Sequence, residues 1–402
     1  MAFQNGVPLL STLNLANNLL GKIPFMAISS MKTLKTLDLS NNRIEMIEDS
    51  FSKIRLKLDK LNLQENNIRV ISKNSFQNFK WINFTSLRNN PINTIQDHAF
   101  LETGVKELDF HNCHIGNLNP GAFRGLERIL ESLDLSSNRL SFLPSNVFED
   151  FDIIRKLSVG NNMLALSPNI SFSSFRYLVL STEVEFYLVN KLLPTARYTV
   201  EDLDLQGDHM RYIPMREMGI MRSLRKVAIA STRDYGNLRP SQFEDFPPGL
   251  EVLNLIDSNI KVVRSNAFYH IPSVSRLDLS GNKIVRIEDQ AFREIGKSLL
   301  HLKMCHALHT HQLPNTPFQS LTALLSLDLS DNHIRVVPLD TFHHMNRLEK
   351  LFLQVNEILT TNDKIEANIF FTGQRNKFLS YWNVSQSSKL QVASFGFILQ
   401  SH

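Results

Sequence analysis

The chain has 402 residues, of which 43% are hydrophobic, and a formal net charge of +4. No stretch reaches the roughly 18 consecutive apolar residues of a membrane-spanning helix, and so small a net charge argues against a nucleic-acid binder, which typically has a basic stripe. The two cysteines, Cys113 and Cys305, are too few to define a disulfide framework or a redox compartment.

One pattern of apolar residues recurs along most of the chain. Its clearest copy runs from Leu130 to Phe148 and begins LESLDLSSNRL, or L-x-x-L-x-L-x-x-N-x-L, which is typical of a long leucine-rich repeat. The spacing between copies is mostly 24 or 25 residues, and about fifteen repeats are predicted. Their first apolar positions are Leu10, Leu34, Leu58, Ile82, Val105, Leu130, Ile154, Phe175, Val200, Leu224, Leu250, Val274, Leu299, Leu324 and Leu348.

Each repeat predicts the same local structure. Leu133 and Leu135 alternate with polar residues, so they face the core from one side of a short strand. Asn138 follows at the turn, where its amide can bond the backbone of its own turn and of the next repeat. Because a single repeat cannot bury its apolar face alone, the repeats must stack. We therefore expect an α/β fold, a leucine-rich-repeat solenoid (horseshoe) with a concave parallel β-sheet.

The domain organisation follows from where the pattern holds. Residues 1–358 are predicted to form the leucine-rich-repeat array, and residues 359–402 a divergent tail that is not in repeat phase. The repeats at 175–258 are irregular, because their spacing varies and the turn asparagine is replaced. Irregular repeats can mark a bend or a binding insertion, but sequence drift is the simpler explanation. Since neither end carries a cap over the array, we expect the chain to be a fragment of a longer protein.

The residue between the two strand leucines faces the concave surface, and it is often acidic. This position holds Asp38, Asp109, Asp134, Asp204, Asp278 and Asp328. The row of carboxylates could form an acidic trough for a basic or polyhydroxylated partner. Alternatively, each aspartate bonds neighbouring serine and asparagine side chains, and this second interpretation is favoured because aspartate belongs to the common form of the repeat.

An apolar interruption of this surface, within the irregular repeats, is the predicted binding site. Its residues are Tyr177, Val179, Ala228, Ala230, Val252 and Ile256, around Asp202 and Asp204. An error of one residue in the register would instead turn these side chains into core, and the sequence leaves that alternative open.

Three triplets match the motif for N-linked glycosylation, at Asn83, Asn169 and Asn383. Asn169 lies on a predicted return segment and is the most accessible of the three. Asn83 is the less convincing site, because the Thr85 of its triplet occupies a core position of the predicted strand.

Candidate metal and catalytic groups are sparse. The segment from His301 to His311 holds four histidines and Cys305, which are zinc-binding residue types. Its side chains would point in different directions as the strand becomes a turn, and no CxxC or HExxH motif accompanies it, so a metal site is not favoured. No GxSxG motif or phosphate loop is present, and we predict neither an enzyme nor a cofactor.

Three segments carry a resemblance to a known family. Residues 37–51 (LDLSNNRIEMIEDSF), 108–123 (LDFHNCHIGNLNPGAF) and 274–292 (VSRLDLSGNKIVRIEDQAF) resemble the extracellular leucine-rich-repeat proteins of the chaoptin family. The resemblance implies a cell-surface glycoprotein that mediates adhesion by binding protein, including a second copy on an apposed cell. It also implies that the membrane is reached only through segments absent from this chain.

Two other functions remain open on the sequence. A Toll-like ligand-sensing receptor ectodomain shares the repeat but usually carries clusters of cysteine, which this chain lacks. A cytosolic leucine-rich-repeat scaffold is suggested only by the scarcity of cysteine and the absence of a signal peptide. The prediction is therefore a non-catalytic, cell-surface adhesion protein that uses its concave face.

Overall fold

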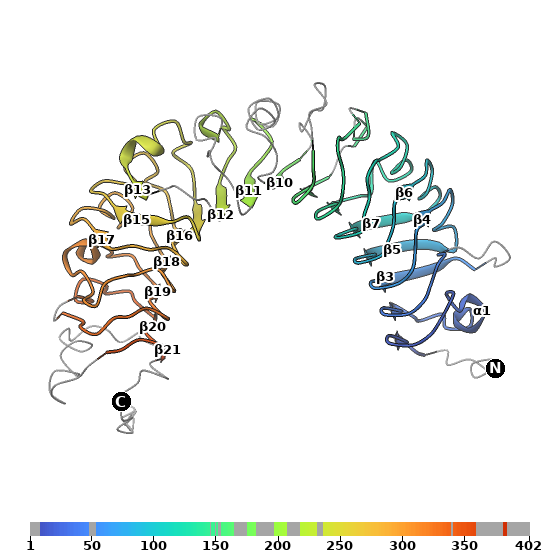
Figure 1. Ribbon diagram of the computed structural model, residues 1–402, viewed down its shortest axis with the longest axis horizontal. Helices are drawn as coiled ribbons and strands as arrows, with labels where there is room; N and C mark the ends of the chain where they lie inside the picture. The colour runs from blue at the N-terminus through green and yellow to red at the C-terminus, as the bar shows by residue number, and fades with distance from the viewer. Residues whose placement is uncertain are drawn as a thin grey trace, which may run out of the picture. The chain divides into compact units, whose positions relative to one another are not determined.

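The structure is a computed structural model of the chain. It describes residues 9–47, 54–144, 146–148, 150–151, 154–164, 175–181, 197–206, 218–230, 236–338, 341–358 and 381–383. The chain divides into two compact units, Met1–Leu224 (unit 1) and Arg225–His402 (unit 2). Each unit is a parallel-sheet solenoid in which consecutive repeats contribute neighbouring strands (Figure 1).

The main sheet of unit 1 contains one strand from each of its nine predicted repeats. In order, the strands are β1 (Thr12–Asn14), β2 (Thr36–Asp38), β3 (Leu56–Asn62), β5 (Phe79–Ser86), β7 (Gly104–Asp109), β8 (Ser132–Asp134), β9 (Lys156–Ser158), β10 (Tyr177–Ser181) and β11 (Asp202–Gln206). On the return side, β4 (Val70–Ile71) and β6 (Thr94–Ile95) form a small second sheet.

The main sheet of unit 2 continues the same plan. Its strands are β12 (Lys226–Ala230), β14 (Val252–Ile256), β16 (Arg276–Asp278), β18 (His301–Lys303), β19 (Ser326–Asp328), β20 (Lys350–Phe352) and β21 (Tyr381–Asn383). The second sheet contains β13 (Gly236–Leu238), β15 (Ile260–Val263) and β17 (Arg286–Ile287). Strand β21 belongs to the segment predicted as a divergent tail, and it pairs in parallel with β20.

The register of the main sheets places the predicted core leucines in columns. Leu133 of β8 pairs with Leu108 of β7 and Leu157 of β9, and all three are buried. In the irregular repeats, Leu178 of β10 pairs with Leu203 of β11, and both are fully buried. The predicted core leucines of these strands are therefore buried as the register requires, although Ser158 and Val179 of the opposite face are buried as well.

The return segments contain little helix. The helices with defined bounds are α1 (Phe25–Ile28) and two short 3-10 helices, η2 (Pro240–Gln242) and η3 (Thr316–Ser320), and Met218 and Gly219 are also helical. Phenylalanines pack behind the strands instead, as the repeat predicts. In unit 1 the centroid of the Phe100 ring lies 4.8 Å from that of Phe76 and 6.1 Å from that of Phe123. Stacked rings of this kind bury a large apolar area between neighbouring repeats. Among the described residues no helix has the length and apolar character to cross a membrane.

A ladder of buried asparagines joins the repeats. The Asn66 amide nitrogen donates to the Leu63 carbonyl of its own turn (3.0 Å) and to the Leu39 carbonyl of the preceding repeat (3.0 Å). Its side-chain oxygen accepts from the Ile44 N–H, also in the preceding repeat (3.0 Å). The prediction that the asparagines bond the next repeat is therefore wrong. Each asparagine satisfies backbone groups of the repeat before it, because those groups face its turn.

Two substitutions in the ladder show how it tolerates change. The thiol of Cys113 donates to the Leu87 carbonyl (3.0 Å), the group that an asparagine amide would reach. At Ala307, which has no polar side chain, the backbone carbonyl accepts from the Ile284 N–H (2.8 Å). Burial raises the pKa of Cys113 to about 12, so this thiol stays protonated and unreactive.

Candidate functional site: the exposed face of the main sheets

The predicted binding residues in unit 1 lie side by side on two strands. Tyr177 of β10 pairs with Asp202 of β11, and Val179 pairs with Asp204. Tyr177 and the two aspartates are half-buried, whereas Val179 is only 7% exposed. Val179 therefore fills the space between its neighbours more than it offers contact area to a partner.

Tyr177 is the chemically distinctive residue of this group. Burial, followed by the charges of Asp204 and Asp202, raises its pKa to about 12. The protonated phenol donates a hydrogen bond to the Asp204 side chain, and the Lys156 ammonium lies 5.3 Å from the centroid of its ring. An aromatic ring held by a cation and a carboxylate is a rigid contact group, because little side-chain entropy remains to be lost on binding.

The other four predicted binding residues lie in unit 2. Ala230 of β12 pairs with Ile256 of β14, and Ala228 pairs with Asn254, next to Val252. All five side chains are half-buried, while the alternate residues of both strands are core. The site residues thus fall into two groups of four, one polar and aromatic on unit 1 and one apolar on unit 2.

The aspartate column has a structural explanation. The Asp134 carboxylate accepts from the Ser136 N–H (2.8 Å) and from the Ser136 hydroxyl. Four further aspartates accept the N–H two residues ahead in the same way, at Asp38, Asp109, Asp278 and Asp328. Each carboxylate closes the turn that ends its strand, as short polar side chains commonly do. This geometry favours the interpretation in which aspartate serves the repeat over the acidic trough.

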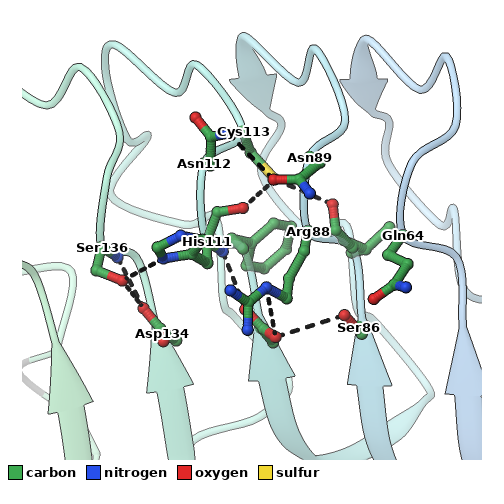
Figure 2. Close-up of polar contacts among 12 residues, drawn as sticks. Gln64, Ser86, Arg88, Asn89, His111, Asn112, Cys113, Asp134 and Ser136 are labelled. Atoms are coloured by element: carbon green, nitrogen blue, oxygen red, sulfur yellow. Dashed lines mark hydrogen bonds and ion pairs between the residues drawn. The ribbon is translucent and has the colours of Figure 1, made fainter.

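A polar cluster on unit 1 was not predicted from the sequence. His111 Nδ1 lies 2.9 Å from the Ser136 hydroxyl, which donates to Asp134, and Arg88 Nε lies 3.8 Å from Asp109 Oδ2. Figure 2 shows Arg88, His111 and Ser136 just beyond the ends of neighbouring strands. All three residues occupy the position that follows the second apolar residue of the predicted strand.

The chemistry of this cluster is that of a fixed surface and not of a nucleophile. The Ser136 hydroxyl donates its proton to Asp134, so His111 can only donate to it and cannot accept its proton. Burial raises the pKa of Asp109, and the neighbouring Asp134 adds to the rise, while the His111 N–H and Arg88 oppose it. The cluster presents one imidazole and one guanidinium in a defined arrangement.

Ion pairs join neighbouring repeats at the residue that follows the first apolar position of each repeat. Lys106 Nζ lies 3.1 Å from Glu131 Oε1 in unit 1, and Arg225 Nη1 lies 2.8 Å from Glu251 Oε1 in unit 2. Each pair joins neighbouring strands, so its charges neutralise each other on the flank of the sheet. Exposed pairs of this kind contribute little to stability.

Of the predicted glycosylation sites, only Asn83 has a described side chain. It lies in β5, where its amide nitrogen donates to Asp59 Oδ1 (3.1 Å) and its oxygen accepts from the Trp81 indole N–H (2.7 Å). Thr85 is fully buried. Asn169 lies outside the described residues, and so does the side chain of Asn383, whose backbone forms the end of β21.

The histidine-rich segment of unit 2 does not gather its ligand types. His306 is exposed and its Nδ1 lies 3.2 Å from Asp331 Oδ2, whereas His301 lies on the strand face. Within the described part of the chain, no group of three histidine, cysteine, aspartate or glutamate side chains could hold a metal ion. Both cysteines are free.

Comparison with known proteins identifies the repeat. A family model described as "Leucine rich repeat" matches residues 103–164, 222–284 and 297–358. A second model, "BspA type Leucine rich repeat region", matches residues 1–129. The chain belongs to the leucine-rich-repeat family.

Individual relatives of this leucine-rich-repeat chain are extracellular or cell-surface proteins. It is 34% identical to chaoptin of Drosophila melanogaster over 248 residues, which is 61% of this chain and 17% of the relative. It is 24% identical to Tsukushi of Gallus gallus over 293 residues, which is 72% of this chain and 65% of the relative. The chain thus spans only about a sixth of the length of chaoptin.

Solved structures share the fold. The chain in the TLR13–ssRNA13 complex superposes with a TM-score of 0.58 at 19% identity, covering 90% of this chain and 61% of that one. A leucine-rich-repeat protein of Leptospira interrogans gives a TM-score of 0.58 at 20% identity, covering 92% of this chain and 96% of that one. At this level of identity the likeness concerns the solenoid alone.

Proposed function

We propose that the protein is a non-catalytic, cell-surface adhesion protein that binds a protein partner through the exposed face of its main sheets. The observation that carries the proposal is the exposed face, where half-buried side chains change from repeat to repeat above columns of buried, mostly leucine side chains. Stacked repeats hold such a face rigid over many strands, which suits contact with a large partner.

The two groups of predicted binding residues supply complementary contacts. Tyr177, with Asp202 and Asp204, offers an aromatic ring and acceptors for hydrogen bonds. Ala228 and Ile256 are half-buried and form a shallow apolar surface, which a partner can cover without displacing ordered side chains. Aromatic side chains in partly buried settings are the residues that most often dominate binding energy.

The similarity to chaoptin supports a place at the cell surface. Adhesion at a surface does not need a tight single contact, because many copies on apposed membranes act together. A second copy of the same chain is the first partner to test, since homophilic contact needs no further protein.

The test is bead clustering. Beads coated with the full chain should cluster, and a double variant that alters both groups, Tyr177→Ala with Val252→Ser, should reduce clustering strongly. The matched control is Met163→Ala with Val285→Ser, which changes exposed apolar residues that lie outside the main-sheet strands of the same two units. The control should cluster like the parent.

Two results would contradict the proposal. Absence of clustering in the parent, with the native β-rich circular dichroism spectrum, would rule out homophilic adhesion. Equal clustering by parent and double variant would show that the contact lies elsewhere on the molecule.

A further inference from the structure

Three exposed cations lie on neighbouring and nearby strands of the main sheet of unit 2. Arg276 of β16, Lys303 of β18 and Lys350 of β20 are all exposed. Within the described part of the chain, none of the three has a carboxylate within 4.0 Å. By contrast, Lys106 and Arg225 each bond a glutamate on the next strand. These three cations therefore have no direct ion pair among the described residues.

The register places these cations around one imidazole. Arg276 pairs with His301, which pairs with Ser326, which pairs with Lys350. At about 4.8 Å per strand, the three steps from Arg276 to Lys350 span about 14 Å. Burial lowers the pKa of His301, and the charges of Arg276 and Lys350 lower it further. The positive charges of its neighbours thus disfavour the protonated imidazole. Arg276, His301 and Lys350 share one column of the sheet, and Lys303 stands in the next. We name these four residues together the basic column.

The basic column is interleaved with carboxylates that limit what it can bind. Asp278 and Asp328 flank Lys303 on the neighbouring strands. Both accept the N–H of a serine two residues ahead, at 2.9 Å and 3.0 Å, so they are held in place by their turns. A polymer with a negative charge on every unit would meet these two carboxylates as well as the cations. A chain whose acidic groups are separated by neutral groups would not.

We propose that the basic column binds an extended acidic segment of a protein partner, with carboxylates about four residues apart that reach Arg276 and Lys350. The spacing follows because an extended chain advances about 3.4 Å per residue, so about four residues cover 14 Å. Arg276 can hold one carboxylate through two parallel hydrogen bonds, and Lys350 can hold the other as a point charge. The inference rests on the proposed function, since it gives the chemistry of the protein partner.

The experiment measures peptide binding to the full chain in solution. A labelled peptide with Glu-Ser-Thr-Ser-Glu at its centre is compared with Gln-Ser-Thr-Ser-Gln by fluorescence anisotropy. The glutamate peptide should bind, the glutamine peptide should not, and raising the salt from about 50 to about 300 mM should weaken binding about ten-fold. The triple variant R276Q/K303Q/K350Q should lose about ten-fold or more in affinity.

The matched control removes the same charge elsewhere on unit 2. Lys261, Lys283 and Lys297 are exposed and lie outside the main sheet, so K261Q/K283Q/K297Q should bind like the parent. Equal losses in both triple variants would overturn the proposal, because net charge alone would then explain binding. A heparin fragment or single-stranded RNA that binds the basic column more tightly than the peptide would also overturn it.

The two assays distinguish a failure of the peptide-binding proposal from a failure of the adhesion proposal. Peptide binding is measured on single molecules in solution, whereas clustering requires many copies on a surface. Clustering that persists while the glutamate peptide shows no binding would reject the basic column and leave the adhesion function standing. Specific peptide binding without clustering would reject the adhesion function and leave the basic column standing.

Discussion

Unit 1 and unit 2 are built from one repeat, yet they present different charges on their main sheets. In unit 1, Arg88 lies beside Asp109, and Lys106 bonds Glu131 across the strands. In unit 2, Arg225 bonds Glu251 in the same way, whereas Arg276 and Lys350 have no such partner among the described residues. The buried columns are the same in both units, because every repeat must stack on the next. The exposed columns are under no such requirement, and so they carry the differences that can serve recognition.

Removing an asparagine of the buried ladder in each unit tests whether the two interiors are alike, and we expect these variants to lose the most stability. Asn90 in unit 1 bonds the Leu63 and Leu87 carbonyls and the Ile68 N–H, so Asn90→Ala removes three buried bonds. The two carbonyls keep a second donor, Asn66 and Cys113, whereas the Ile68 N–H is left unpaired. We expect a loss of about 3 kcal/mol in the free energy of unfolding, measured by urea titration. Asn282→Ala in unit 2 breaks the equivalent bonds and also the bond from the Ser258 N–H, so it should cost at least as much.

The control for both variants is an exposed asparagine. Asn93→Ala removes a side chain that makes no hydrogen bond in the structure, and it should change stability by less than about 0.5 kcal/mol. A cost for Asn282→Ala well below that for Asn90→Ala would show that unit 2 relies less on its ladder.

Two glycines, one in each unit, test how closely neighbouring repeats pack, and their substitution should change the unfolding free energy by a smaller amount. A Cβ added at Gly296 in unit 2 would lie 2.1 Å from the Ser320 carbonyl oxygen, which is backbone and cannot move alone. Gly296→Ala should therefore cost about 1–3 kcal/mol in unfolding free energy. A Cβ at Gly104 in unit 1 would lie 2.2 Å from the Trp81 ring, which is half-buried and can rotate away. Gly104→Ala should cost less.

Tryptophan fluorescence separates the two cases. The chain has two tryptophans, so a Trp382→Phe background leaves Trp81 as the single reporter. Gly104→Ala should shift its emission to longer wavelength, because the indole would leave its seat beside Asn83. An unchanged spectrum together with a large loss of stability would mean that the backbone moves instead of the ring.

The buried columns could be predicted because burial constrains them. Leu178 and Leu203 lie in the most irregular repeats, yet the pattern placed both in the core. The asparagine positions were equally predictable, since only a buried amide satisfies both its own turn and a neighbouring one. The direction of those bonds was not, because a repeat pattern shows position along the chain and not which neighbour faces the turn.

The exposed features depend on contacts between strands, which sequence spacing alone does not show. The bond between His111 and Ser136 joins residues 25 positions apart and requires the exact register of β7 and β8. Lys303 stands in the column of Asp278 and Asp328, whereas Arg276 and Lys350 stand in the neighbouring column. The predicted binding residues and the glycosylation of Asn83, Asn169 and Asn383 remain predictions.

The titration of His301 gives a smaller effect that is specific to unit 2. Its pKa is lowered from the ordinary value, so the imidazole adds a charge to the basic column only at a lower pH than an ordinary histidine would. The groups that face this imidazole are Arg276, Lys303, Lys350, Glu349 and Ser326. Affinity for the glutamate peptide should rise about three-fold between pH 7.5 and 5.5, since a bound carboxylate favours the protonated form.

The variant that removes this effect is His301→Gln, which should bind at pH 7.5 like the parent and show a flat profile to pH 5.5. Circular dichroism at each pH checks the fold, because a histidine with a lowered pKa weakens the folded state as the pH falls below its unfolded value. A pH dependence that survives in His301→Gln would assign it to another group.

The smallest effect concerns the ion pairs that distinguish the flanks from the basic column. Lys106 and Glu131 have side chains 40% and 32% exposed, so water and salt screen their attraction. A double-mutant cycle of Lys106→Gln and Glu131→Gln should give a coupling of about 0.5 kcal/mol that disappears in about 0.5 M salt. The Arg225–Glu251 pair is more exposed, at 65% and 50%, and should couple still less. A strong coupling in either pair would mean that pairing, and not recognition, decides where cations stand on these sheets. The unpaired state of Arg276 and Lys350 would then be a cost that a bound carboxylate relieves.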